Sequence, residues 1–255
     1  MKYFFLFMLF SFTLLADDAK KHRKVLFRMA GVWSGTGENV SVNSSNKQFP
    51  SKSEQKSLGK PIFNEKALFR RVNYRIIIPD QEDRIFDSFV ISFWLDFKQK
   101  YRSVTFDSRG VVYQKDFTMD DDGNCKVYTL VDDKFVESGQ SKVTQVLFKG
   151  SSEYQARGFL RKATFEFKRV PEVKFVDPKV EFDPAVKKVL DTFPGKYPLT
   201  GHFKLAEGKD VLTIFGYETK PKVFKKWEIH KDGNYKVYEG KDFLENGKGY
   251  WRQVE

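Results

Sequence analysis

A short apolar helical stretch that runs into a glycine and an aromatic residue occurs twice in this chain. No other feature constrains the fold as much. The two copies are 24–33, with Val25, Leu26, Met29, Gly31 and Trp33, and 188–197, with Val189, Leu190, Phe193, Gly195 and Tyr197. Their spacing is identical at every one of these positions. The match predicts duplication of one structural module rather than a single large fold.

Strand-like segments fill the sequence between the two copies. Val72, Tyr74 and Ile76 alternate with polar neighbours, as expected for a strand with one buried face. The segments expected as strands are 31–42, 67–78, 84–97, 101–107, 111–118, 125–131, 143–149, 153–160 and 163–169. Turn residues separate them at Pro79-Asp80, Ser108-Arg109-Gly110, Asp122-Gly123-Asn124 and Lys149-Gly150-Ser151. About nine short strands without crossover helices predict an antiparallel barrel or sandwich.

Residues 41–60 are polar, rich in Ser and Lys, and show no periodicity. We expect them to connect the first strand to the next. Two interpretations stay open, a lid or portal over the barrel and a plain flexible surface loop.

A second unit follows a proline-punctuated linker at 171–184. Asp183 and Pro184 form a helix start, with Asp183 as the N-cap and Pro184 in the first turn. Five further strands are expected, at 199–206, 210–217, 222–230, 234–239 and 248–254. We therefore predict a smaller antiparallel β unit over 185–255, an open curved sheet that packs against the first unit.

The alignment of the two units has two solutions. Asp122–Tyr128 matches Asp232–Tyr238 at six of seven positions, yet the distance from the preceding aromatic residue is 89 residues in one unit and 35 in the other. The alternative pairs Gly110 with Gly233. Either solution leaves the second copy short of at least one hairpin.

The first sixteen residues have the composition of a signal peptide. Lys2 precedes an apolar stretch from Tyr3 to Leu15, too short to span a bilayer comfortably, and Ala16 offers a small residue for cleavage. An uncleaved N-terminal anchor is the alternative. We expect an exported protein, periplasmic or secreted, whose mature chain begins with a barrel domain over 17–170.

The cysteine content limits how the fold is stabilised, and the net charge indicates which kinds of partner the protein attracts. Cys125 is the only cysteine, so no intrachain disulfide can form. The formal net charge is +11, and such a basic exported protein is drawn to acidic polysaccharide, lipid headgroups or extracellular nucleic acid unless the charge serves solubility alone.

The run from Gly31 to Gly37, Gly-Val-Trp-Ser-Gly-Thr-Gly, resembles the opening of nitrobindins, lipocalins and exported bacterial lipocalin-like domains of unknown function, all members of the calycin group. The segments 93–96, 100–101, 106–110 and 215–218 are similar to the middle of those bacterial domains. The resemblance implies a mostly β fold, a lipocalin-like antiparallel barrel preceded by a short helix. We assign barrel-closing structural roles to Gly31, Trp33, Gly35, Gly37, Gly195 and Tyr197, because glycine lets a strand bend and admits rings closely.

The same resemblance suggests where a ligand would be held. Lipid-carrying barrels bind a carboxylate or phosphate with inward-pointing arginines, whose planar fork suits that task. The candidate ligand-binding residues are Arg71, Arg75, Arg102 and Arg157. The alternative for the first two is that they lie with Asn73 on the solvent face. Nitrobindins hold haem through a histidine, and no histidine lies between His22 and His202, so we expect no haem.

Sequence signatures of catalysis and metal binding are absent. No Cys/His spacing suits zinc, Asp120–Gly123 fits a turn better than a calcium loop, and no nucleophile elbow or phosphate loop occurs. We therefore predict no catalytic residue, no metal and no cofactor, and an esterase or lipase has little support.

Two functions follow from these observations. The first is an exported, monomeric, non-enzymatic protein that holds a small apolar or amphiphilic molecule in its barrel. The alternative is a surface interaction module that binds acidic polysaccharide, the cell envelope or a partner protein. Specific nucleic-acid binding is not expected.

Overall fold

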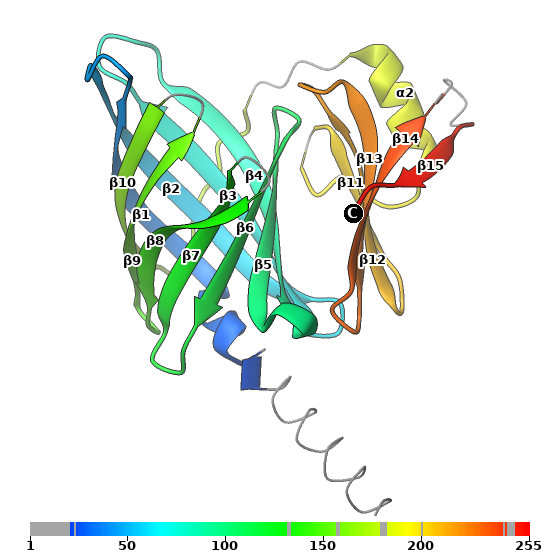
Figure 1. Cartoon of the computed structure of the whole chain (residues 1–255), viewed down its shortest axis with the longest axis horizontal. Helices are drawn as coiled ribbons and strands as arrows, with labels where there is room; N and C mark the ends of the chain where they lie inside the picture. The colour runs from blue at the N-terminus through cyan, green and yellow to red at the C-terminus, as the bar shows by residue number, and fades with distance from the viewer. Residues whose placement is uncertain are drawn as a thin grey trace, which may run out of the picture.

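The computed structural model describes residues 21–22, 24–131, 134–156, 159–178, 183–199, 201–241, 243 and 248–255. It contains a closed antiparallel barrel and a separate five-stranded antiparallel sheet (Figure 1). A short helical segment precedes each of them, so the predicted fold class is confirmed. The expected signal peptide at 1–16 lies outside the described residues. No helix in the described part of the chain is long and apolar enough to cross a bilayer.

The barrel is an up-and-down meander in which every strand pairs with the next along the chain, and β1 pairs with β10 to close it. Its strands are β1 (Gly31–Val42), β2 (Gln48–Ile62), β3 (Ala67–Ile77), β4 (Arg84–Leu95), β5 (Lys100–Asp107), β6 (Val111–Met119), β7 (Asn124–Val131), β8 (Lys134–Val143), β9 (Leu147–Ala156) and β10 (Phe159–Arg169). A 3-10 turn, η2 (Asp96–Lys98), links β4 to β5.

Strand β2 replaces the loop that we expected at 41–60. It pairs with β1 along its length and with β3 on its other side, so neither a lid nor a flexible loop forms there. The periodicity is missing because both faces are polar. Ser53 and Ser57 point toward the barrel axis, while Lys52 and Lys60 are exposed. The backbone ladders to two neighbours hold this strand in place.

Strands β8 and β9 correct a second expectation. The predicted strands 143–149 and 153–160 and the turn at Lys149-Gly150-Ser151 are wrong, because β9 runs unbroken through Gly150. A Cβ atom at Gly150 would lie 2.5 Å from the carbonyl oxygen of Gln140 and 2.8 Å from the ring of Phe165. The glycine is there to let neighbouring groups approach, and the turn lies just before β9.

A helical segment closes one end of the barrel. Residues 24–26 are helical and continue into the 3-10 turn η1 (Phe27–Met29). Val25, Leu26 and Met29 are buried in a core whose other members are Leu68, Tyr101, Phe117, Met119, Cys125 and Val143. Removal of these apolar side chains from water stabilises the closed end.

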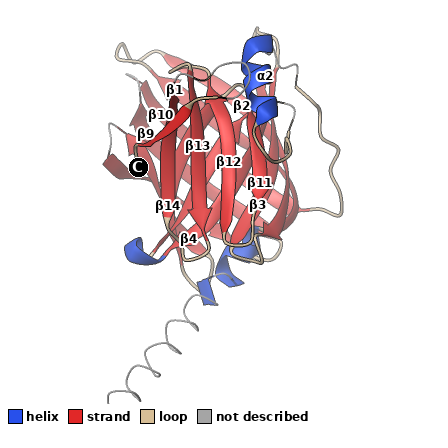
Figure 2. Ribbon diagram, turned by 90° about the vertical axis from the view of Figure 1, so that its right-hand side faces the viewer, coloured by secondary structure: helices blue, strands red, loops and turns tan. Residues whose placement is uncertain are grey.

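The second sheet contains β11 (Phe203–Glu207), β12 (Val211–Glu218), β13 (Val223–His230), β14 (Tyr235–Lys241) and β15 (Tyr250–Gln253), in that order. It lies against the outer wall of the barrel (Figure 2), where it shares a core with residues of β3, β4 and β5. Trp227, Phe203 and Ile214 share one buried core with Phe89 and Phe106 of the barrel. The predicted open sheet that packs against the first unit is therefore present.

Helix α2 (Pro184–Thr192) begins as the sequence predicts. Asp183 is its N-cap, and the Asp183 carboxylate accepts a hydrogen bond of 2.9 Å from the backbone N–H of Ala185. Val186, Val189 and Leu190 bury the apolar side of α2 against the face of the sheet that lies opposite the barrel.

The linker that follows β10 is tied to the barrel. Asn73 donates a hydrogen bond of 2.8 Å to the carbonyl oxygen of Val176 and accepts one of 3.3 Å from the N–H of the same residue. Arg71 forms an ion pair with Asp177 at 2.8 Å, and its guanidinium lies 4.4 Å from the ring centre of Phe175. Residues 175–177 therefore run along the outside of β3 as an extended strap.

Candidate functional site: the barrel lumen and an outer groove

Cross-strand register fixes which side chains face the barrel interior, since residues directly opposite each other point to the same face. On β3 the inward set is Leu68, Arg70, Val72, Tyr74 and Ile76, from the closed end to the other end. The odd-numbered residues of that strand point outward. Sequence alternation predicted the inward positions of Val72, Tyr74 and Ile76 correctly.

Trp33 lies at the closed end of the lumen. Its side chain is 3 % exposed, and its indole N–H donates to the carbonyl oxygens of Met29 at 3.2 Å and Ala30 at 3.3 Å. The guanidinium of Arg169 lies 4.7 Å from the indole centre and donates a hydrogen bond of 3.0 Å to Ala30. These contacts fasten the entry helical turn to the first and last strands.

Gly35 and Gly37 lie two and four residues after Trp33 on β1, and both face the lumen. A Cβ atom at Gly35 would lie 2.4 Å from the ring of Phe167, and one at Gly37 would lie 2.8 Å from the carbonyl oxygen of Thr164. Because glycine has no side chain, β1 and β10 can approach each other closely at these two positions, and the phenylalanine rings can extend into the interior. Gly31 has a positive φ of 99°, which glycine adopts at no steric cost.

Gly195 and Tyr197 close no barrel, because the second sheet is open. Gly195 has a φ of 100°, close to that of Gly31. Tyr197 is only half-buried, and its hydroxyl donates to Asp191 of α2 at 2.7 Å. The two units thus share a glycine conformation, while the predicted duplication stays a prediction.

The lumen contains a hollow of about 500 Å³ that extends from Trp33 to Ser41 and Arg161 near the far strand ends. Its wall on β2 is polar, with Ser51, Ser53, Gln55 and Ser57. Aromatic rings gather toward the far end, where Tyr74 stacks on Phe86 at 4.9 Å and Phe49 meets Phe159 edge to face at 6.2 Å. The volume lies within the range of small-molecule sites.

Two cations face this hollow just above the closed end, Arg70 on β3 and Lys115 on β6. Among the described residues, neither side chain forms an ion pair, and the Arg70 Nε atom is buried without a hydrogen-bond partner. Burial lowers the pKa of both groups, and repulsion from Arg70 lowers the pKa of Lys115 further. The lumen-facing carboxylate of Asp107, near the far end, is engaged with Arg109 at 2.5 Å.

The arginines that we named from the sequence do not line the hollow. Arg71 and Arg75 point outward from β3, where Arg71 pairs with Asp87 and Asp177, and Arg75 pairs with Asp83 at 2.6 Å and Glu54 at 3.3 Å. Arg102 points outward from β5 into the interface with the second sheet. Arg157 lies outside the described residues. The first three are therefore not brought together, and a lumenal role for them does not fit the structure.

Sequence reasoning missed Arg70 and Lys115. The inward position of Arg70 could have been predicted from the sequence, because alternate residues of a strand share one face and Arg70 alternates with Val72, Tyr74 and Ile76. Lys115 carried no comparable signal. Its strand meets β3 only through β4 and β5, so the barrel topology brings the two cations to one cavity.

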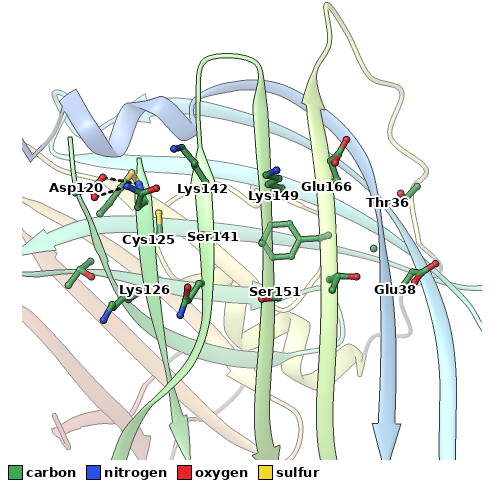
Figure 3. Close-up of a pocket in the computed structure, with 18 residues that line it drawn as sticks. Thr36, Glu38, Asp120, Cys125, Lys126, Ser141, Lys142, Lys149, Ser151 and Glu166 are labelled. Carbon is green, nitrogen blue, oxygen red and sulfur yellow. Dashed lines mark hydrogen bonds between the residues drawn. The ribbon is translucent and has the colours of Figure 1, made fainter. Parts of the chain in front are cut away.

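A second hollow of about 920 Å³ lies on the outside of the barrel (Figure 3). Its floor is the backbone of one register row that crosses six strands, Met119, Cys125, Ser141, Gly150, Phe165 and Gly37. The neighbours of each floor residue point outward and form the walls. We call this feature the outer groove.

Other chemistry-bearing residues have structural surroundings. Asp120 accepts hydrogen bonds from the backbone N–H groups of Asp122 and Asn124, both at 2.9 Å, as in an ordinary turn. Cys125 is buried, and burial raises the pKa of its thiol to about 11. Within the described ranges, no three His, Cys, Asp or Glu side chains gather in a way that could hold a metal ion.

A closed antiparallel barrel with a helical segment across one end fits a calycin-like fold. No family model matches the chain, and no curated protein matches it. Solved structures similar to it include the S-type phycobiliprotein lyase CPES from Guillardia theta, with 15% identity over 59% of this chain and 93% of that one and a TM-score of 0.38. Another is a β-barrel-like protein of the domain of unknown function DUF1849 from Brucella abortus, with 10% identity over 82% and 91% and a TM-score of 0.20. At these values neither likeness supports an inference about what this chain binds.

Proposed function

We propose that this protein is a non-enzymatic carrier that holds an anionic amphiphile in its barrel, with the acidic group beside Arg70 and Lys115. The observation that supports this proposal is the pair of lumenal cations without an acidic partner in the described structure. Arg70 and Lys115 repel each other across the hollow, and an anion between them would offset that repulsion. Export, for which the composition of residues 1–16 is the support, and a monomeric state belong to the same proposal.

The order of side chains along the wall supports a head-first orientation. Of the β3 residues that line the hollow, Arg70 lies nearest the closed end of the barrel, and Val72, Tyr74 and Ile76 follow toward the far end. On β6, Lys115 precedes Tyr113 in the same direction. An acidic headgroup would therefore lie deep in the barrel, and its apolar chain would lie along the aromatic end. Carboxylate and phosphate groups both suit an arginine fork beside a lysine.

The test compares ligands and variants. A fluorescent fatty acid and its methyl ester are titrated into wild type, Arg70→Met and Lys115→Met. We expect each variant to bind the acid at least about tenfold more weakly, which is about 1.4 kcal/mol, and to bind the ester as wild type does. Arg75→Met and Lys126→Met remove exterior cations on β3 and β7 and serve as matched controls. Equal affinity of wild type and both lumenal variants for the acid contradicts the proposal.

Binding should also depend on pH. Because the pKa of Lys115 is lowered in the folded protein, its charge is lost below the ordinary lysine value of 10.5. Affinity for the acid should fall as pH rises toward that value from below. In the same window the unfolded chain binds more protons at this site, so the free energy of unfolding of the empty protein should rise with pH.

The control for this pH dependence is Lys115→Met. Arg70 and Tyr74 line the hollow with Lys115, and Arg161 and Lys162 line it near the far end. Asp107 and Tyr113 have inward register positions on β5 and β6. Subtracting the pH profile of the variant from that of wild type isolates the contribution of the lysine from that of Tyr74, whose pKa burial raises. A pH profile for affinity that is identical in wild type and Lys115→Met would show that this side chain does not face the bound anion.

A further inference from the structure

The outer groove carries a like-charged pair at its centre. Lys142 of β8 and Lys149 of β9 are directly opposite each other in the register and both point outward. Figure 3 shows their side chains on neighbouring strands, with Lys126 on the wall of the same groove. None of the three lysines forms an ion pair with a described residue.

This pairing needs a physical reason, because like charges directly opposite each other across two strands are destabilising. Three acidic side chains line the groove, and none of them forms an ion pair with Lys142 or Lys149 in the described structure; Asp120 accepts hydrogen bonds within its own turn. Glu166 is opposite Lys149, but its ion pair is with Lys168 at 3.9 Å. Glu38 lies farther along on β1. An anionic group between Lys142 and Lys149 would offset their repulsion.

The remaining walls of the outer groove are rich in neutral hydrogen-bonding groups. Hydroxyls and amides line it on five strands, from Thr36, Thr118, Gln140, Ser151 and Thr164. The groove crosses the six strands from β6 to β1, five interstrand spacings, which is roughly 24 Å. Its dimensions and lining suit a linear polyhydroxylated chain better than a compact apolar molecule.

We infer that the outer groove is a binding site for an acidic polysaccharide, with a uronate or sulfate group between Lys142 and Lys149 and sugar hydroxyls along the Ser/Thr walls. The groove contains no outward-pointing aromatic ring on which a nucleobase could stack, since the Phe165 ring contacts Phe148 and Phe167 inside the barrel. The lumen and the groove lie on opposite sides of the same wall, so this site is separate from the proposed carrier site.

The test measures binding of full-length protein to polygalacturonate, with uncharged dextran and oligodeoxythymidylate as comparison polymers. The double variant Lys142→Gln, Lys149→Gln should bind polygalacturonate at least about tenfold more weakly than wild type. The matched control, Lys52→Gln with Lys60→Gln, removes two exposed lysines from β2 and should lose less than about twofold. Thermal unfolding confirms that both doubles are folded.

Two outcomes would overturn the inference. In one, both doubles lose affinity equally, or oligodeoxythymidylate binds as tightly as polygalacturonate, which indicates attraction to net charge alone. In the other, wild type does not bind polygalacturonate at moderate salt. Lys115→Met separates the two proposals, because it should keep polysaccharide affinity while it loses the fatty acid.

Discussion

Replacing Trp33 with alanine should lower the free energy of unfolding by about 3–5 kcal/mol, the usual cost of removing a large aromatic side chain from a core. The indole fills the closed end of the barrel and contacts Phe148 edge to face at 6.4 Å. Its loss leaves a cavity and removes the indole N–H that donates to the carbonyl oxygens of Met29 and Ala30. Arg169 would lose the ring on which its guanidinium lies.

Chemical denaturation followed by circular dichroism measures this effect. Trp33→Phe keeps most of the apolar area but not the indole donor, so it should lose less than the alanine variant. Tyr250→Ala is the control, because that ring is 58% exposed and its removal should change stability by less than about 0.5 kcal/mol. A Trp33→Ala protein as stable as the control would contradict the role of Trp33 at the closed end.

The second large effect is expected at Arg102, which the sequence suggested as a ligand-binding residue. Its side chain is 2% exposed and donates to both carboxylate oxygens of Asp116, at 2.8 Å and 3.2 Å. It also contacts Glu255 at 3.0 Å, and its guanidinium lies between the rings of Phe135 and Tyr235. Arg102→Met should cost about 3–5 kcal/mol, because the Asp116 carboxylate stays buried without its partner.

A double-mutant cycle distinguishes this ion pair from a ligand site. Arg102→Met combined with Asp116→Leu removes both charges and should recover much of the lost stability. Affinity for the fluorescent fatty acid, measured below the unfolding transition of the variant, should equal that of wild type. If Arg102→Met weakens acid binding while leaving stability unchanged, the original ligand assignment is the better one.

Local sequence patterns predicted the strands that have one apolar face and the helix that has a cap. The alternation at 72–76 and the Asp183-Pro184 start of α2 are of this kind. Strands β2 and β8 were not predicted, because the lumen-facing side of each strand is polar like the outward side and hydrophobic alternation is therefore missing. Gly150 looked like a turn residue although it serves close packing, a distinction that depends on what the neighbouring strand places there.

The candidate site was harder to predict than the fold for a related reason. We looked for cations among the outward residues of β3, whereas the apolar side of that strand also carries Arg70. When one face of a strand carries both charged and aromatic side chains, the alternation of apolar and polar residues no longer tells which face points inward. The outer groove could not be foreseen, since its floor joins six strands whose register only the closed sheet defines.

The second sheet gives the barrel two unequal sides. Strands β3 to β5 share a hydrophobic core with that sheet and are stiffened from outside, while β7 to β10 and β1 face solvent. The unsupported side also holds Gly35, Gly37, Gly139 and Gly150, where neighbouring groups lie too close for a Cβ atom. The strands that the second sheet covers should therefore exchange their amide hydrogens more slowly than the uncovered ones, and a molecule bound in the outer groove should slow exchange in the strands that it crosses.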